Sequence, residues 1–545
     1  MKKQLVYLLT GWLMCGMGLQ ARAQVEPLFT YKISRDEACN RWVESQMKQM
    51  NLREKIGQLF IYTIAPDRSK RNLALLKNVV HTHKVGGLLF SGGKLDNQAL
   101  LTNQAQKMAD VPLMITFDGE WGLSMRLRGT PVFPKNMVLG CIQDDRLIYE
   151  YGQEMARQCR ELGVQVNFAP VADVNINPQN PVINVRSFGE NPLLVADKVI
   201  AYASGLESGR VLSVAKHFPG HGDTDVDSHK ALPVLPFTRE RLDSVELYPF
   251  RKLIHAGLGG VMVGHLQVPV FEPIGKLPSS LSRNVVYTLL TEKMAFKGLI
   301  FTDALAMKGV SSAQKVCLQA LKAGNDVVLA PRDVKKEIDY VVEAVKKGEF
   351  SEEEIDERCR KVLLFKYAMG LNRKPVVRLS GLERRINTPH TRDLIRRLNL
   401  AAVTVLNNEK GVLPIHPDVK KVAVLTVGKA KELEAFTNEL KKYVEVHTFE
   451  LGKQMPDSLQ QKLRDSLSAY RRIIVPVNEI RLAPYQSFFA KFAPQVPVVY
   501  AFFTPAKLML QIHRAISNAS SVVLGHTDSD EVQEQIAALL FGKAA

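Results

Sequence analysis

The sequence predicts an α/β protein in which a (β/α)8 barrel is followed by a smaller doubly wound α/β sandwich domain. Apolar, β-rich segments alternate with helical patterns from about residue 50 to residue 370. Polar residues that can take part in catalysis follow these segments, and a second α/β series begins near residue 420. A chain of 545 residues is also too long for one ordinary domain.

The first series contains eight strand candidates with near-continuous apolar cores. Such cores are typical of parallel strands that are buried on both faces of a sheet. Helical patterns, such as those of residues 145–162 and 351–369, lie between or after the strands. Eight strand–helix units in roughly 300 residues match the size of a (β/α)8 barrel. The candidates are residues 57–64, 85–92, 112–119, 166–174, 213–220, 259–268, 297–305 and 324–331.

The second series predicts a smaller sheet, because helical patterns again separate its strands. No phosphate-binding G-x-G-x-x-G or Walker loop follows any of these strands. An Arg-rich, loop-like stretch at 371–392 separates the two series. We expect a catalytic barrel at 24–375, a linker at 376–395 and a C-terminal α/β domain at 396–545. The strand candidates of the second domain are residues 420–428, 444–451, 471–478, 496–503 and 520–527.

Residues 1–23 have the layout of a secretory signal peptide. Two lysines precede the apolar stretch LVYLLTGWLMCGMGL, and Ala21-Arg22-Ala23 forms an A-x-A cleavage site. Bulky residues precede Cys15, so cleavage after Ala23 is favoured over a lipoprotein anchor. We expect an exported protein, periplasmic or secreted. The rest of the chain has no apolar run long enough to span a bilayer, so no stable membrane insertion is expected after signal removal.

The composition, with 46% hydrophobic and 23% charged residues, is that of a globular protein. The formal net charge is +17 and falls to +14 when Lys2, Lys3 and Arg22 leave with the signal. No Lys/Arg block or nucleic-acid motif is present, so we expect no nucleic-acid partner. A solvated basic surface or an anionic polymer such as cell wall accounts for the charge. The six cysteines form no C-x-x-C pair, and we expect mostly buried thiols without a disulfide framework.

Ionisable side chains lie at or just after the carboxyl ends of the predicted barrel strands. In a (β/α)8 barrel these ends surround one mouth, where catalysis takes place. Residues without a shared role would be scattered or would lie on helix exteriors. The residues concerned are Asp118, Asp173, Lys216, His217, His265 and Asp303.

The segment KHFPGHGDTDVDSH, residues 216–229, allows three interpretations. His217 and His221 have the spacing of zinc ligands on a helix, but Pro219 and Gly220 between them exclude a regular helix. We therefore expect no metal. A second interpretation is a polar loop whose side chains bond the backbone. It is favoured for His221 and for the acids at positions 223 and 225.

The third interpretation is a proton relay between Asp227 and His229. A carboxylate that accepts from one imidazole nitrogen fixes the tautomer and leaves the other nitrogen free for general acid–base catalysis. Asp303, in GLIFTDALAM, ends the seventh strand and is placed to attack an anomeric carbon. An aspartate there can also cap the next helix, but the convergence of strand ends favours a nucleophile.

These motifs resemble the NagZ-type β-N-acetylglucosaminidases of glycoside hydrolase family 3. The resemblance is carried by KHFPGHGDTDVDSH together with FTDALAM, RSFGENP and NFAPVADV. MNLREKIGQLF, near the start of the barrel, and PSSLS at 278–282 are similar as well. The likeness covers the barrel and continues into the second domain, as in exported two-domain members of the family.

The resemblance implies a retaining double displacement through a covalent glycosyl-enzyme, without a metal or an organic cofactor. Asp303 matches the nucleophile, His229 the acid/base and Asp227 its dyad partner. The implied substrate is a GlcNAc-containing glycan or muropeptide with a terminal non-reducing GlcNAc, and we expect peptidoglycan fragments to be its source. The matching sugar-binding residues are Asp118, Arg126, Arg186, Lys216 and His217.

The sequence departs from the family pattern in one segment. Many relatives read D-Q-E-G-G-R-V-x-R, whereas residues 118–126 read DGEWGLSMR. Glu120 is kept, but Leu123 replaces an arginine and Trp121 replaces a glycine, which puts the aglycone preference in doubt. A phosphorylase or a β-glucosidase of the same family are alternative enzymes. A non-catalytic wall-binding protein is the alternative of another class, and it would require a missing nucleophile or relay.

Overall fold

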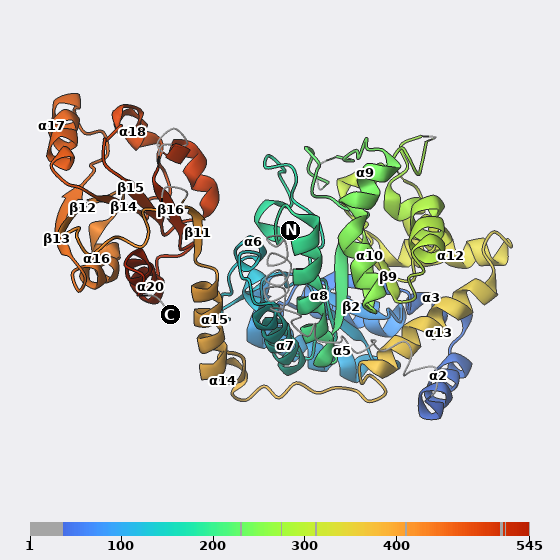
Figure 1. The fold of residues 1–545 in the computed structure, drawn as a ribbon. Coiled ribbons are helices and arrows are strands. Elements are labelled where there is room, and N and C mark those ends of the chain that lie inside the picture. Colours follow the sequence, from blue (N-terminus) through green and yellow to red (C-terminus); the bar gives the residue numbers. More distant parts are fainter. Residues whose placement is uncertain are drawn as a thin grey trace, which may run out of the picture.

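The computed structural model describes residues 36–228, 231–273, 275–310, 313–408, 411–512, 516–517 and 519–543. A barrel and a second sheet domain lie beside each other (Figure 1). The helices α14 (Leu382–Ile386) and α15 (Pro389–Ala401) lie between them. No helix in the described part of the chain is long and apolar enough to cross a bilayer.

The barrel is a parallel sheet of eight strands in the order β10-β1-β2-β4-β6-β7-β8-β9. A bridge between Phe301 of β9 and Val327, just before β10, joins the two edge strands and closes the barrel. Each of the eight predicted segments contains one strand, and the predicted fold class is confirmed. The strands are β1 (Phe60–Ile64), β2 (Gly87–Phe90), β4 (Met114–Phe117), β6 (Val166–Asn167), β7 (Leu212–Phe218), β8 (Gly260–Val263), β9 (Leu299–Thr302) and β10 (Val328–Leu329).

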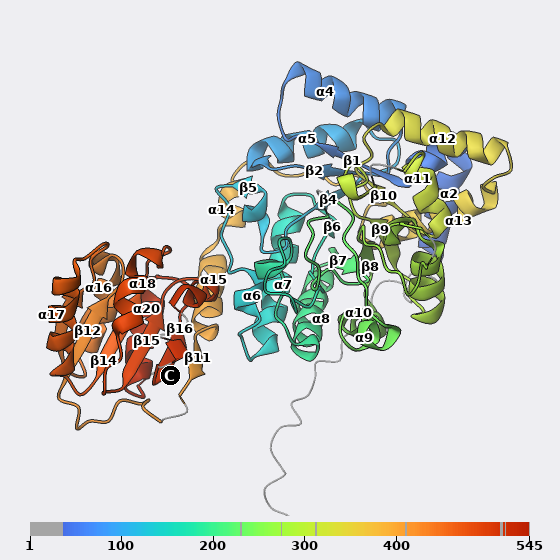
Figure 2. The same cartoon turned by 90° about the horizontal axis from the view of Figure 1, so that it is seen from above.

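Helices surround these strands, as Figure 2 shows in a view that places the strands inside the ring. After β8 a π-helix at Asn284–Lys293 takes the place of an α-helix. A short parallel pair, β3 (Gly93–Lys94) and β5 (Leu127–Arg128), lies outside the barrel sheet. The helices are α2 (Glu37–Gln49), α3 (Leu52–Gly57), α4 (Lys70–Lys77), α5 (Leu95–Met108), α6 (Asn136–Leu139), α7 (Asp145–Glu161), α8 (Pro192–Ser208), α9 (Arg239–Ser244), α10 (Leu247–His255), α11 (Val316–Ala323), α12 (Val334–Lys346) and α13 (Glu352–Ala368).

Local sequence signals define the ends of the long barrel helices. Asp144 caps α7 by accepting a hydrogen bond from the Arg146 amide. Asn191 caps α8, whose first residue is a proline, and Ser351 forms a capping box with Glu354 at the start of α13. Such caps satisfy backbone donors that a helix start leaves unpaired, and each contributes about 1 kcal/mol.

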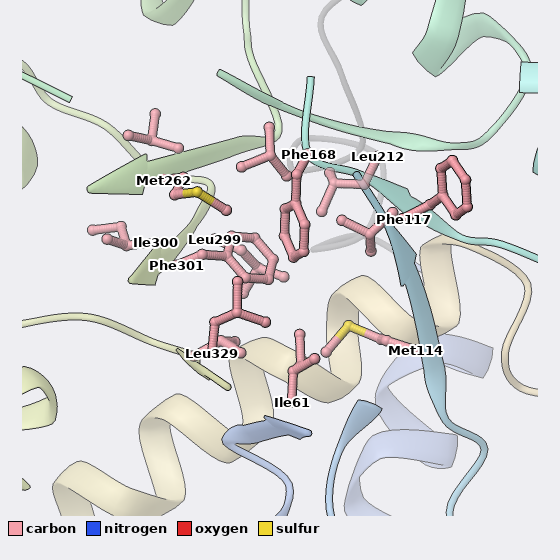
Figure 3. Close-up of a cluster of buried hydrophobic side chains, with 14 of the residues drawn as sticks. Ile61, Met114, Phe117, Phe168, Leu212, Met262, Leu299, Ile300, Phe301 and Leu329 are labelled. Carbon is pink, nitrogen blue, oxygen red and sulfur yellow. The ribbon is translucent and has the colours of Figure 1, made fainter. Parts of the chain in front are cut away.

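The inside of the barrel is filled by large apolar side chains from several strands (Figure 3). Phe168 and Phe301 meet edge to face, with ring centroids 5.6 Å apart. Ile61, Met114 and Leu329 point into the same region and are almost completely buried. Burial of each such side chain stabilises the fold by about 1.5–3 kcal/mol. Polar groups are therefore displaced from the interior to the ends of the strands.

The cysteines of the described residues are unpaired. Cys39, Cys159, Cys317 and Cys359 are buried, and Cys141 is half-buried. Burial raises the pKa of the Cys159 thiol to about 12, so this thiol stays protonated and unreactive. The thiols therefore serve as small apolar packing groups, as expected.

The second domain has a six-stranded sheet in the order β11-β16-β15-β14-β12-β13. Five strands are parallel and coincide with predicted segments, but β11 (Thr404–Asn407) was not predicted and pairs antiparallel with β16. The helices α16 (Glu434–Leu440), α17 (Asp457–Ser468), α18 (Gln486–Lys491) and α20 (Asp530–Leu540) accompany the sheet. The parallel strands are β12 (Lys421–Thr426), β13 (Glu445–Glu450), β14 (Ile473–Val477), β15 (Val498–Phe502) and β16 (Ser521–Leu524).

The expected loop-like stretch 371–392 contains α14 and the start of α15. Thr388 caps α15 and Pro389 occupies its first turn, a combination that favours a helix start. Arg157 of α7 donates to the Ile386 carbonyl over 3.1 Å. The Thr391 hydroxyl donates to the buried Glu154 carboxylate over 2.6 Å. Polar contacts with the barrel thus keep this segment ordered.

Candidate active site

The predicted strand-end residues all lie in the described part of the chain. Asp118 follows β4, and Lys216 and His217 lie in the last half of β7. Asp173, Lys216, His217 and His265 are buried, whereas Asp118 and Asp303 are half-buried. Parallel strands of a closed barrel end at one rim, so these groups share the mouth.

A compact network of charges lies at the ends of β4 and β7. The Lys216 Nζ lies 2.5 Å from Asp118 Oδ1 and 2.8 Å from Glu120 Oε1. Arg126 pairs with the other oxygen of Asp118. Arg186 donates two hydrogen bonds, of 2.8 and 2.7 Å, to Glu120. Lys216 therefore separates two carboxylates that would otherwise repel each other.

The network keeps its members charged. Burial raises the pKa of Asp118, but Lys216 and Arg126 outweigh it and hold that pKa far below its usual range. Burial likewise opposes ionisation of Glu120, yet Lys216 and Arg186 lower its pKa. Burial would lower the pKa of Lys216, but Asp118 and Glu120 raise it above normal. Fixed carboxylates and cations side by side are suited to binding paired sugar hydroxyls, which both donate and accept.

The neighbouring contacts of His217 define its tautomer. Its Nε2 lies 3.2 Å from Nη2 of Arg186, and its Nδ1 lies 2.7 Å from Asp173 Oδ2. Arginine can only donate, so in the neutral form of the ring Nε2 accepts and Nδ1 carries the proton that is donated to Asp173. Asp173 also accepts from the His217 amide over 3.1 Å. The imidazole is thus held at a defined orientation beside the charge network.

Asp303 lies immediately after β9, and its own amide donates to the Val263 carbonyl over 2.9 Å. Its Oδ1 accepts from the Ala304 amide over 2.7 Å, whereas none of the described residues donates to Oδ2. Burial raises the pKa of Asp303, but His265, His217, the Ala304 amide and Lys216 together bring it below the ordinary value. The group is an ionised carboxylate with one available oxygen, as a nucleophile requires.

The neighbouring His265 supports this arrangement. Its ring is fully buried, with Nδ1 2.7 Å from the Ser280 hydroxyl and Nε2 3.1 Å from the Ala304 carbonyl. Because a carbonyl only accepts, Nε2 is the donor in the second contact. His265 therefore binds the backbone of the residue that follows the candidate nucleophile.

The proposed acid/base loop is described as far as Ser228. Asp227 is half-buried, and its carbonyl accepts from the Ala231 amide over 3.0 Å. His229 lies outside the described residues, so its role as acid/base stays a prediction. His221, expected to shape the loop, is buried and bonds Thr224 and Ser228.

Two residues to which the sequence analysis assigned no role in catalysis or binding have central positions. Glu120 joins Lys216 to Arg186, and Asp173 holds both His217 and the start of the loop. The sequence contained a signal for both, because each follows a predicted strand and lies close to a motif that was used.

The Leu123 side chain, in the place of the family arginine, is completely buried. Trp121 lies under the Lys135 ammonium, 5.5 Å from the ring centroid.

The described residues contain no group of three or more His, Cys, Asp or Glu side chains with the spacing of a metal site. His217 and His221 each use both ring nitrogens in hydrogen bonds within the protein.

A (β/α)8 barrel with an available carboxylate and fixed charge pairs at its mouth has the groups that a retaining sugar-processing enzyme uses. The chain belongs to glycosyl hydrolase family 3, because the sequence model of the family's N-terminal domain matches residues 51–365. It is accordingly a glycoside hydrolase.

Individual relatives agree with this assignment. The chain is 30% identical over 391 residues to β-hexosaminidase A of Pseudoalteromonas piscicida, covering 65% of this chain and 65% of that protein. It is 34% identical over 331 residues to β-hexosaminidase LpqI of Mycobacterium tuberculosis, covering 58% and 82%.

Solved structures match both domains. A family 3 β-N-acetylglucosaminidase from Paenibacillus is 30% identical with a TM-score of 0.69, covering 91% of this chain and 97% of that one. A β-glucoside phosphorylase is similar in fold, with a TM-score of 0.76 at 21% identity over 94% and 96% of the two chains.

Proposed function

We propose that the protein is an exported, retaining exo-β-N-acetylglucosaminidase that removes terminal non-reducing GlcNAc from peptidoglycan fragments. The observation that carries the proposal is the ionised, half-buried Asp303 beside the Asp118–Lys216–Glu120–Arg186 network, in which Lys216 and Glu120 are buried. The likeness to the Paenibacillus β-N-acetylglucosaminidase extends over both domains and supports the choice of sugar.

The proposed reaction has two steps, which are formation and hydrolysis of a glycosyl ester. Asp303 attacks the anomeric carbon while His229 gives its proton to the departing glycosidic oxygen, which breaks the glycosidic bond and forms a glycosyl ester. Water then attacks the same carbon, His229 takes its proton, and Asp303 leaves as a carboxylate. Two inversions retain the β configuration. Asp227 stabilises the imidazolium that this exchange requires.

The role of the charge network is to bind the terminal sugar. Lys216, Arg186 and Arg126 donate to sugar oxygens, while Asp118 and Glu120 accept from hydroxyls. All five are already ionised and paired, so substrate binding needs little reorganisation of the site.

An acidic aglycone is supported by the loop that follows β4. Residues 121–143 contain Arg126, Arg128 and Lys135 but no aspartate or glutamate. The Lys135 ammonium lies over one face of Trp121, which follows Glu120 in the sequence. Sugars stack on such faces, and a carboxylate on the neighbouring sugar would be attracted by the cations.

A β-glucosidase is the second candidate. The chain is 27% identical over 388 residues to a β-N-acetylglucosaminidase/β-glucosidase of Cellulomonas fimi, covering 69% of this chain and 68% of that protein. Phosphorolysis is tested in the same assay, since it would transfer the sugar to phosphate instead of water.

The decisive assay incubates the signal-free protein with defined GlcNAc–MurNAc fragments, aryl N-acetylglucosaminide and aryl glucoside, each with and without inorganic phosphate. We expect free GlcNAc from the first two, at rates that phosphate does not change, and little glucose. Appearance of GlcNAc 1-phosphate or preferential release of glucose would replace the proposal by one of the alternatives. Binding of chitooligosaccharide without any turnover would point to the non-catalytic wall-binding protein.

A further inference from the structure

His221 lies in the loop between β7 and the proposed acid/base, and the mechanism above does not use its ring. The side chain is 1% exposed. Nδ1 lies 2.7 Å from the Thr224 hydroxyl and Nε2 lies 3.0 Å from the Ser228 hydroxyl. Because both nitrogens are bonded inside the protein, this imidazole cannot exchange a proton with substrate.

The hydrogen bonds around Thr224 indicate which nitrogen carries the proton. The Thr224 hydroxyl donates to the His221 carbonyl over 3.1 Å, and the Asn180 amide donates to the same carbonyl over 2.8 Å. Since a hydroxyl has a single proton, Nδ1 donates to Thr224 and Nε2 accepts from Ser228. Burial lowers the pKa of His221 to about 4, which keeps the ring neutral near pH 7.

The backbone around His221 is fixed to the barrel rim. The His221 amide donates to Asp173 Oδ1 over 2.7 Å, and the other oxygen of Asp173 accepts from the ring of His217. At Gly222 a Cβ atom would come within 1.8 Å of the Val174 carbonyl oxygen, so the chain lies directly against the segment that follows β6. His221 thus forms a hydrogen-bonded bridge between Asp173 at the barrel rim and Ser228 further along the loop, and the end of this bridge at the rim is fixed.

The other end of the bridge is Ser228, the residue before His229 in the sequence and after Asp227. Ser228 is 2% exposed, and its carbonyl oxygen lies 3.2 Å from the position that a Cβ of Gly309 would occupy. The segment that leads into the proposed dyad is thus enclosed by the loop that follows Asp303.

We propose that His221 is a positioning residue for the acid/base step. Through Thr224 and Ser228 it holds the last described residues before the proposed acid/base at a fixed place relative to the barrel rim. The proposal rests on the proposed function, because it assumes that His229 protonates the leaving group. His221 itself touches neither substrate nor the reacting atoms.

The test compares His221→Phe, Ser228→Ala and Thr224→Val on aryl N-acetylglucosaminides with leaving groups of different pKa. Good leaving groups need no protonation, so loss of an acid mainly affects poor ones. We expect His221→Phe to lower kcat/KM roughly 10- to 100-fold for poor leaving groups and less than about 3-fold for dinitrophenolate. The His221→Phe/Ser228→Ala double variant should be no slower than His221→Phe alone, since the two residues act through one contact.

His83→Phe is the matched control. This buried histidine precedes β2 at the amino-terminal end of the barrel, where its Nε2 lies 3.2 Å from the Asn78 side-chain amide. We expect its variant to lose thermal stability without any dependence of kcat/KM on the leaving group. If His221→Phe lowers kcat/KM equally for all leaving groups, or if its effect adds to that of Ser228→Ala, the positioning role is wrong.

Two further results keep the test independent of folding and of the proposed function. Should His221→Phe fail to fold, Ser228→Ala and Thr224→Val must each show the leaving-group dependence, and its absence in both overturns the inference. His229→Ala serves as the reference. If it lacks the dependence, the proposed acid/base assignment fails, whereas dependence in His229→Ala but not in the His221 series overturns only the role of His221.

Discussion

At the residue scale, the site depends on charges that are buried in pairs. Lys216 is 2% exposed and contacts two carboxylates, so its ammonium is compensated only as long as both are ionised. Removing one member of such a group leaves an uncompensated charge in a poorly solvated place, which is more costly than the intact pair is favourable. Position 216 therefore stabilises the barrel rim, and we propose that it also binds the sugar.

Lys216→Met removes the ammonium that separates Asp118 from Glu120. We expect the free energy of unfolding to fall by about 3–5 kcal/mol at neutral pH, measured by urea denaturation. Lys135→Met, which removes an exposed ammonium, is the control and should change stability by less than about 0.5 kcal/mol.

The same network predicts a dependence of stability on pH. Asp118 and Glu120 have folded-state pKa values below their ordinary ones, so their stabilisation is present at neutral pH and is lost as both carboxylates protonate in acid. The wild type should lose more stability than Lys216→Met between neutral pH and about pH 3. If the free energies of unfolding of the two proteins change equally with pH, the assigned role of the ammonium is wrong.

At the element scale, the carboxyl end of α8 is joined to the starts of β7 and β8 by one buried carboxyl. Glu207 Oε1 accepts from the Gly259 amide over 3.2 Å and from the amide and hydroxyl of Ser213. Its Oε2 has no partner among the described residues. Burial raises the pKa of Glu207 to about 8, so the group is neutral in the folded protein near pH 7.

Glu207→Gln should stabilise the protein increasingly as pH rises. The unfolded chain releases the Glu207 proton near pH 4.3, whereas the folded protein holds it until about pH 8, so the wild type loses stability between these values. We expect the free energies of unfolding of the two proteins to be similar near pH 4, and that of the variant to be higher by a few kcal/mol near pH 8. Thermal melts at several pH values provide the test. A difference in melting temperature between wild type and Glu207→Gln that does not change with pH would contradict this account.

At the scale of the whole molecule, α7 connects the barrel to the segment that leads into the second domain. Arg157 binds Glu154 through two hydrogen bonds of 2.7 Å and also contacts carbonyls of α14. Arg397 of α15 pairs with Glu150, also on α7. These contacts fix α14 and α15 on the barrel (Figure 1).

Arg157→Met should loosen this junction. It leaves the buried Glu154 without its guanidinium and the end of α14 without two donors, at a cost of about 2 kcal/mol or more. Arg396→Ala removes an exposed pair with Asp393 and should cost less than about 0.5 kcal/mol. Calorimetry should show two separated transitions for the first variant and a profile unchanged from wild type for the second.

Much of the architecture could be predicted because its signals are local. Continuous apolar runs such as GLIF and VVYAFF mark buried parallel strands whatever their partners. The strand β11 was not predicted although the run AAVTVL is largely apolar; its Val405 and Leu406 are exposed, and pairing with β16 defines the strand. The helices at 382–401 were missed because their stability comes from contacts with α7 in addition to their own sequence.

The candidate site was predicted from residue types at strand ends, and its partners were not. Lys216 and Asp118 are far apart in the sequence, and only closure of the barrel shows that the ammonium also reaches Glu120. The double use of Asp173 likewise depends on the loop after β7, whose His221 amide returns to the segment that follows β6. Sequence patterns indicate which groups reach the mouth, whereas the contacts between them require the fold.

The central claim is that Asp303 and His229 act on the same glycosidic bond from opposite sides. It is tested most directly by incubating His229→Ala with dinitrophenyl N-acetylglucosaminide, stopping the reaction within seconds and mapping modified peptides by mass spectrometry. The first step should proceed and the second should stall, so we expect one N-acetylhexosaminyl group in ester linkage to Asp303. A label on another carboxylate, or continued product release with no labelled peptide, would contradict the account.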